Sequence, residues 1–314
     1  GAVLYWCAAG AVFVLLRAPR GRRRRWAVVV LACLACSWAL WRPWAQPDAI
    51  DVIDMKYGEA ILLRDASGAA ALVDGGYRSA YVDEGARTVA PYLLTLGVTR
   101  LDRVVATHAD ADHLGGLFHV VETLDVGEAV LGPASDAELE RAFLDLCARR
   151  RVPVRRVVPG DTLDFGGARL EVLHPPPDWR PGADNNNSVV LRYVRGGLRV
   201  LLTGDIEAEA EQRLARTGCA AAVLKTPHHG SDTSSTPALL DAVRPGEALV
   251  PVNGYGSRAS LAPEVAARYR KRGIRIWRTD YHGGLRLRRS GAGWRVSSAR
   301  EKRGIPLAPP DAPH

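Results

Sequence analysis

Apolar and polar residues follow two different rhythms between residues 48 and 299. Short apolar runs predict strands at residues 49–54, 60–65, 70–74, 102–106, 128–131, 168–174, 189–193, 200–202, 223–225, 247–252 and 274–278. Apolar residues at helical spacing predict helices at residues 83–97, 136–150, 206–217, 236–243 and 261–272. The two halves of this region share the same order of elements. We therefore expect an α/β fold in which two sheets pack face to face with helices outside, an αββα sandwich.

The first 44 residues show another pattern, which predicts a transmembrane helical hairpin. Residues 1–16 and 26–41 carry no charge, and residues 17–25 between them contain six arginines. Each apolar run is somewhat shorter than the roughly 20 residues of a typical spanning helix. Because positively charged loops stay in the cytoplasm, the chain after Trp44 is expected outside the membrane. Since Gly1 is not an initiator methionine, we expect residues 1–44 to be a fragment of a larger membrane domain.

Proline content predicts the remaining boundaries. Residues 43–47 are expected to form a linker, residues 48–299 a folded domain, and residues 300–314 a disordered tail. A chain of 314 residues with 47% hydrophobic and 24% charged residues can bury a large core, which excludes a disordered protein. The five cysteines form no disulfide framework, and Cys33 and Cys36 are expected to be packing residues in an apolar helix.

The candidate chemistry lies at the ends of three predicted strands. The first group is His108, Asp110, Asp112 and His113, on a turn that two glycines close. Each residue alone would more often be a cap or a solvated turn residue. Together, after a buried strand, they can point into one small volume and hold two cations. Asp205 and the pair His228 and His229 follow two later strands and provide further ligands.

The order of these motifs resembles the metallo-β-lactamase superfamily and, within it, the hydrolase domain of ComEC-type DNA-internalisation competence proteins. The motifs are His-x-Asp-x-Asp-His from His108, Asn-Asn-Asn-Ser from Asn185, Leu-Leu-Thr-Gly-Asp before Ile206, Lys-Thr-Pro-His-His-Gly-Ser from Lys225, and Arg-Thr-Asp-Tyr-His-Gly-Gly from Arg278. One departure concerns residues 56–59. This chain has Lys-Tyr-Gly-Glu where the family usually has Gly-Gln-Gly-Asp, which leaves full catalytic competence open.

Spacing and resemblance jointly imply a ligand assignment. His108 and Asp110 would hold one cation, Asp112, His113 and His229 the other, and Asp205 would bridge them. Asp110 stands where relatives often have histidine, and its oxygen shifts the preference from zinc towards manganese or magnesium. We expect two divalent metal ions, manganese favoured, with zinc or magnesium possible.

The resemblance also suggests roles at the substrate. The predicted catalytic residues are Asp112, Asp205, His228 and Lys225, although Lys225 could equally be a surface lysine at a strand edge. The predicted substrate-binding residues are Asn186, Asn187, Ser231 and His282. The asparagines suit phosphate as hydrogen-bond donors, but a polar turn explains them as well. His174 is an alternative metal ligand and is more readily explained as a cap of its strand.

A net charge of +8 is compatible with a polyanionic partner or an anionic membrane surface. Arginines between residues 268 and 303 alternate with Tyr269, Trp277 and Tyr281, as in a groove for single-stranded nucleic acid, although outward strand faces give the same pattern.

The leading hypothesis is a metal-dependent nuclease that degrades the non-imported DNA strand. Alternatives are a catalytically weak DNA-binding gate and a small-molecule metallo-hydrolase. The expected partners are single-stranded DNA, the inner membrane, an upstream channel domain of the same protein and other competence proteins. The expected location is a multi-pass inner-membrane protein with its catalytic domain on the periplasmic side.

Overall fold

A computed structural model describes residues 48–179, 184–252, 261–291 and 293–300, the strand at 305–306, and four isolated positions before residue 48. The chain divides into two compact units, Gly1–Gln46 and Pro47–His314, and the description below concerns the second. The transmembrane hairpin predicted for residues 1–44 lies almost entirely outside the described residues. Among the described residues, no helix combines the length and apolarity needed to cross a membrane.

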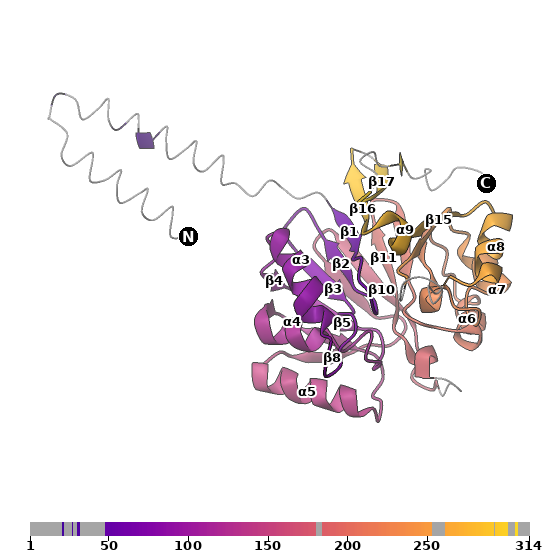
Figure 1. Cartoon of the computed structure of the whole chain (residues 1–314), viewed down its shortest axis with the longest axis horizontal. Coiled ribbons are helices and arrows are strands. Elements are labelled where there is room, and N and C mark those ends of the chain that lie inside the picture. The colour runs from indigo at the N-terminus through magenta and orange to yellow at the C-terminus, as the bar shows by residue number, and fades with distance from the viewer. Residues whose placement is uncertain are drawn as a thin grey trace. The chain divides into compact units, whose positions relative to one another are not determined.

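Two sheets form the centre of the second unit (Figure 1). The first sheet has nine strands in the spatial order β18 (Ile305–Pro306), β17 (Gly293–Ser298), β16 (Leu285–Ser290), β1 (Ala49–Val52), β2 (Ile61–Arg64), β3 (Ala70–Val73), β5 (Arg103–Ala106), β7 (Ala129–Leu131) and β8 (Val154–Arg156). The second has seven, in the order β15 (Arg275–Arg278), β14 (Glu247–Val250), β13 (Val223–Lys225), β12 (Leu198–Leu202), β11 (Val190–Arg195), β10 (Ala168–His174) and β9 (Thr162–Phe165). A short parallel pair, β4 (Arg100–Leu101) and β6 (Asp125–Val126), lies beside them in the fold.

Helices cover the outer face of each sheet (Figure 1). The first sheet carries the π-helical turn η2 (Gly85–Val89), α3 (Ala90–Thr95), α4 (Leu117–Thr123) and α5 (Glu138–Arg150). The second carries α6 (Ala208–Leu214), α7 (Pro237–Val243) and α8 (Pro263–Lys271). The shorter turns are η3 (Asp184–Asn187), η4 (Pro227–Gly230) and α9 (Thr279–His282).

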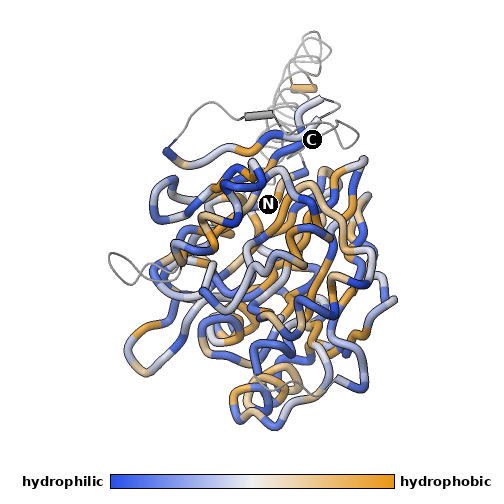
Figure 2. The backbone as a smooth tube through the Cα atoms, turned by 90° about the vertical axis from the view of Figure 1, so that its right-hand side faces the viewer, coloured by the Kyte–Doolittle hydropathy of each residue, from blue (hydrophilic) through white to orange (hydrophobic). Residues whose placement is uncertain are grey.

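Alternation along the strands explains the layers, because successive side chains point to opposite faces of a sheet. Val105 belongs to the core between the two sheets, whereas its neighbour Val104 packs under the helices of the first half. Leu202 likewise joins the central core, and Leu201 packs under the helices of the second half. Apolar positions accordingly concentrate along the central strands in Figure 2. The predicted αββα sandwich with mixed sheets is confirmed.

Several strands were not predicted. The sequence of β16 is Leu-Arg-Leu-Arg-Arg-Ser, in which only Leu285 and Leu287 are buried, so arginines conceal the apolar pattern. This strand pairs with β1, which returns the chain from the second half to the first sheet. β8 and β9 are short and half polar, which hides them in the same way. Within the segment 300–314, Ile305–Pro306 pairs with β17, which differs from the disordered tail expected there.

The topology brings the candidate residues to one edge. β5 runs parallel to β3 and β7, and β12 to β15 are mutually parallel. Asp74, His108, Asp205 and His229 each follow the carboxyl end of one of these strands. Ligands commonly bind outside the carboxyl ends of parallel strands.

Candidate metal centre

Imidazoles and carboxylates from four loops converge at this edge. Nε2 of His113 lies 3.1 Å from Oδ2 of Asp205, and Nε2 of His229 lies 3.2 Å from the same oxygen. Nε2 of His229 is also 3.9 Å from Oδ2 of Asp112. Three sets of donor atoms lie within 4.8 Å of one another and could each hold a metal ion: His108 with His113 and Asp205, Asp112 with His113 and His229, and Glu59 with Asp205 and His229.

Outer hydrogen bonds orient the imidazoles. Nδ1 of His113 lies 2.8 Å from Oδ2 of Asp74, and Nδ1 of His229 lies 2.8 Å from the carbonyl oxygen of Pro251. Because these acceptors require a proton on Nδ1, the network assigns the lone pair to Nε2, which faces the cluster. Nε2 of His108 is buried and forms no hydrogen bond with any described residue. A buried acceptor of this kind suits a metal ion.

Asp74, like Glu59, was not assigned to the site from the sequence. Its carboxylate accepts hydrogen bonds of 2.8 Å from the backbone N–H and the hydroxyl of Thr107, in addition to the contact with His113. Burial alone would raise the pKa of Asp74, but His113 and Thr107 lower it below its usual value. Asp74 therefore fixes both the ring of His113 and the start of the His108 loop. A carboxylate after a buried strand, before two glycines, was the signal that could have identified it.

The turn at residues 56–59 is attached to the metal-binding loop despite its departure from the family pattern. The backbone N–H of Glu59 donates to the carbonyl oxygen of Asp112 at 3.1 Å. Gly58 has a φ of 82°, and a Cβ there would overlap the same carbonyl group. The altered turn is therefore held against the loop that carries Asp112, and the hypothesis of a catalytically weak gate stays an alternative.

Lys225 lies inside the fold, next to Asp205. Its side chain is fully buried, and Nζ lies 2.6 Å from Oε2 of Glu59, 3.2 Å from Oδ1 of Asp205 and 2.7 Å from the carbonyl oxygen of Gly204. Lys225 therefore donates hydrogen bonds to Asp205 and Gly204 and forms an ion pair with Glu59. The surface position is wrong, whereas the catalytic role stays a prediction. In this structure Lys225 positions the carboxylate of Asp205.

The cluster strongly favours ionised Asp205. Burial alone would raise the pKa of this carboxyl, but His113, His229 and Lys225 hold it well below its usual range. Burial lowers the pKa of Lys225 less than Glu59 and Asp205 raise it, so the ammonium stays charged. An ionised carboxylate between two imidazoles is a suitable ligand for a divalent cation.

Two other predicted site residues, Asp110 and His228, lie beside the donor cluster. Oδ2 of Asp110 lies 3.5 Å from Nε2 of His108, but Asp110 is outside the three donor sets. His228 is partly exposed, and its Nδ1 lies 3.1 Å from Oε1 of Glu207. Both His228 and His229 have left-handed backbone conformations, with φ of 45° and 53°, which is strain of the kind found at functional sites.

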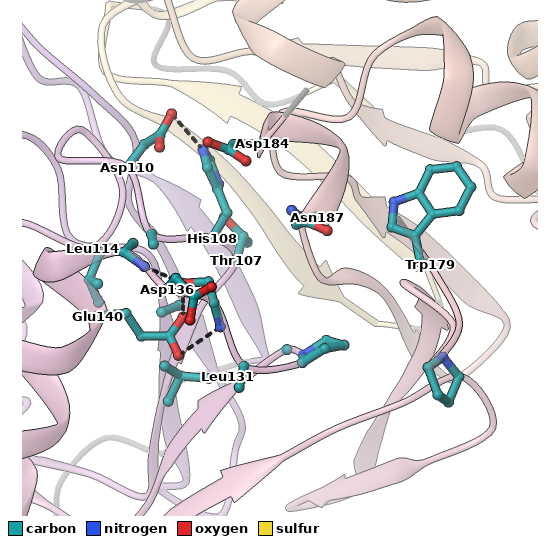
Figure 3. A pocket seen from close by; sticks show the side chains of 18 residues that line it. Thr107, His108, Asp110, Leu114, Leu131, Asp136, Glu140, Trp179, Asp184 and Asn187 are labelled. Carbon is teal, nitrogen blue, oxygen red and sulfur yellow. Dashed lines mark hydrogen bonds and ion pairs between the residues drawn. The ribbon is translucent and has the colours of Figure 1, made fainter. Parts of the chain in front are cut away.

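The substrate-binding predictions receive mixed outcomes. The amide of Asn186 is used within the protein, because its Oδ1 accepts from the N–H of Glu207 at 2.8 Å and its Nδ2 donates to Glu209. Its predicted contact with phosphate stays a prediction. Asn187 lines a pocket beside His108 (Figure 3). Ser231 bonds to its neighbours Asp232 and Thr233, and Nδ1 of His282 contacts the backbone of Arg278.

His174, the alternative ligand, is occupied elsewhere. Its Nε2 lies 2.8 Å from the carbonyl oxygen of Asn186. Burial lowers its pKa to about 4, so the imidazole is neutral and donates this hydrogen bond. His174, which was expected to cap its strand, thus ties the end of β10 to η3.

The arginines of the predicted nucleic-acid groove are spread over several elements. Arg286 pairs with Asp51, Arg289 with Asp48, Arg278 with Asp280 and Arg272 with Asp241. Arg272 follows α8, Arg278 ends β15, and the other two lie on β16, so they belong to different layers. Many of these charges are therefore neutralised locally, and the sequence pattern does not correspond to one basic groove.

Donor chemistry and fold together define the class of protein. Buried nitrogen and oxygen donors fit divalent cations, and an αββα sandwich carries them at the edge of its two sheets. The chain thus has the fold of metal-dependent hydrolases. It belongs to the metallo-β-lactamase superfamily, whose family profile matches residues 55–254.

Curated relatives carry the resemblance further. The chain is 34% identical to "Competence protein ComA" of Neisseria gonorrhoeae over 91% of this chain and 38% of that protein. It is 28% identical to "ComE operon protein 3" of Bacillus subtilis, over 76% of this chain and 33% of that protein. The chain therefore spans about a third of the length of these relatives. A solved structure, the diiron β-hydroxylase CmlA of Streptomyces venezuelae, matches 78% of this chain and 54% of its own with a TM-score of 0.50 and 14% identity, a likeness of fold alone.

Proposed function

We propose that this chain includes the metal-dependent nuclease domain of a DNA-uptake protein. The observation that supports it most is the convergence of His108, His113 and His229 on Asp205 and Asp112. Relatives named for competence support a role in DNA uptake. The proposed substrate is a DNA phosphodiester, and the proposed strand is the one that is not imported. A membrane location, with this domain on the periplasmic side beside a channel domain and other competence proteins, belongs to the same proposal.

Two divalent cations at this site would lower the pKa of a water molecule towards neutrality and stabilise negative charge on the reacting phosphate. His108, His113 and Asp205 would hold one, and Asp112, His229 and Asp205 the other. The carboxylates Asp112 and Asp205 among these ligands favour manganese or magnesium over zinc. Manganese is the metal that we propose.

Residues of the chain then have separate tasks. Asp74 and Pro251 keep Nε2 of His113 and His229 directed at the cluster. Lys225 and Glu59 hold the carboxylate of Asp205 in place. His228 is the partly exposed imidazole of the site, and as an imidazolium it can give a proton to the leaving oxygen. For this role, His228 would have to lie within hydrogen-bond distance of the leaving oxygen.

The direct test is hydrolysis of labelled single-stranded DNA by the full chain with added Mn²⁺. We expect cleavage that chelator abolishes and that Asp205→Asn reduces at least about a hundredfold, since Asp205 belongs to two of the three donor sets. Asp232→Asn is the matched control, because Asp232 is an exposed carboxylate in the loop that follows η4. Unchanged cleavage in Asp205→Asn, or cleavage in chelator, would refute the proposal.

A further inference from the structure

A pocket of about 860 Å³ adjoins the donor cluster on the side of His108 and Asp110 (Figure 3). Its volume is that of a typical small-ligand site. One wall is the segment from Leu131 to Ala137 between β7 and α5, and the opposite side carries Trp179 and Asn187. A substrate atom held at the metals would therefore have the rest of its group in this pocket.

The lining of the pocket is acidic. Among the described lining residues there is no lysine or arginine, and four carboxylates are present: Asp110, Asp136, Glu140 and Asp184. Glu140 is paired with Arg156 and accepts from the hydroxyl of Ser135, and Asp110 faces His108. Asp136 and Asp184 are exposed and form no ion pair within the described part of the chain. This charge disfavours a phosphate backbone in the pocket and favours a group with N–H donors.

The remaining lining is largely apolar. Leu131, Pro133 and Pro177 provide aliphatic surfaces. The ring of Trp179, over which the guanidinium of Arg213 lies at 5.5 Å, provides a flat aromatic surface. A nucleobase matches this lining, because its faces stack on flat side chains and its edge carries the polar groups that the carboxylates can bind.

We propose that this pocket binds the terminal nucleobase of the substrate strand and selects bases with an exocyclic amino group. Asp136 and Asp184 accept hydrogen bonds from the N4 amine of cytosine or the N6 amine of adenine. Thymine has the O4 carbonyl at the corresponding position. This oxygen carries a partial negative charge and is repelled by the carboxylates. The inference rests on the proposed nuclease function and adds a substrate preference to it.

Binding of single nucleotides to the full chain tests the pocket without any turnover. With Mn²⁺ present, calorimetry with dCMP and dTMP is expected to show about tenfold tighter binding of dCMP. The double variant Asp136→Asn, Asp184→Asn should bring the two affinities to within about twofold, because an amide can donate to the O4 carbonyl as well as accept. Glu138→Gln is the matched control, since Glu138 is an exposed carboxylate on α5 that does not line the pocket, and it should keep the preference.

Equal affinity for the two nucleotides, no binding of either, or a preference that survives in the double variant would each overturn the inference. A parallel assay with oligo(dC) and oligo(dT) separates it from the proposed function. Cleavage of both at equal rates would overturn the base preference and leave the nuclease intact. A dCMP preference without cleavage of either strand would support the pocket and refute the nuclease.

Discussion

At the scale of single residues, the centre depends on side chains that hold other side chains. The carboxylate of Asp74 and the carbonyl oxygen of Pro251 fix the tautomers of His113 and His229, and Lys225 fixes Asp205. Such outer contacts commonly change metal affinity 10- to 100-fold when they are lost. Such contacts also compensate the cost of burying the charged groups.

The buried pair Lys225–Glu59 gives the first prediction. Lys225→Met leaves Glu59 and Asp205 buried without their cation, so the free energy of unfolding should fall by about 3–5 kcal/mol in chelator. The double variant Lys225→Met, Glu59→Gln should recover part of this loss, because one of the two unpaired charges is then absent. Urea unfolding of Lys225→Met, Glu59→Gln and the double variant measures this interaction energy. Strictly additive losses would show that the two groups do not interact.

His174 gives a prediction for the pH dependence of stability. Burial lowers its pKa to about 4, whereas an unfolded histidine titrates near 6.5. The unfolded state therefore binds more protons between these pH values, and about 3 kcal/mol of stability is lost as the pH falls from 6.5 to 4. His174→Gln should lack this component. The measurement is the free energy of unfolding of the unaltered protein and of His174→Gln, in chelator, at each pH. If both free energies fall equally with decreasing pH, the prediction is contradicted.

At the scale of elements, the metal-binding loop is positioned by close backbone packing. Gly116 lies at the start of α4, and a Cβ there would overlap the carbonyl oxygen of Gly75 and crowd the backbone of Gly85. The two-glycine closure of the His108 motif is thus needed for packing of α4 against the end of β3 and the start of η2.

Gly116→Ala should therefore destabilise the protein by about 2–3 kcal/mol, since backbone must move to admit the methyl group. Gly293→Ala is the control, because the structure has nothing within 4 Å of a Cβ at that exposed position, and its effect should stay within about 0.5 kcal/mol. Thermal and urea unfolding of both variants provide the measurement. Equal effects would mean that the packing of α4 tolerates a side chain.

The elements that sequence predicted well are those with a clear apolar signal. β10 was predicted at 168–174 and is Ala168–His174, and α5 was predicted at 136–150 and is Glu138–Arg150. His108, Asp112, His113, Asp205 and His229 could be found because each follows a buried strand. Asp74 also follows a buried strand and could have been found, although its contact with His113 is visible only in the fold. Glu59 could not be assigned, because its partner Lys225 is remote in sequence and belongs to the other sheet. Lys225 was expected equally at the surface, since a lysine at a strand end is usually exposed.

At the scale of the whole molecule, the first sheet is completed by the last strands of the chain. β16 pairs with β1 residue by residue from Leu285 to Arg288, and β17 follows it. Arg286 on β16 joins the buried carboxylate of Asp51, which Arg64 also contacts. The arginines of this strand are thus part of its attachment to the sheet.

Replacement of Arg286 and of Arg288 should separate structural from solvent-exposed arginines. Arg286→Gln removes an ionic hydrogen bond to buried Asp51 and should lower the unfolding free energy by about 2 kcal/mol. Arg288 is exposed, and Arg288→Gln should change it by less than about 0.5 kcal/mol. Urea unfolding distinguishes them. A neutral Arg286→Gln would return this residue to the candidates for contact with a polyanion.

Metal stoichiometry tests the central claim most directly. Equilibrium dialysis of the full chain against Mn²⁺, with metal counted by elemental analysis, should give two ions per chain. Asp205→Asn, which removes the carboxylate charge between His113 and His229, should bind at most one ion at the same free concentration. A chain that binds no Mn²⁺, or an Asp205→Asn variant that binds two ions as tightly as the unaltered protein, would contradict the account.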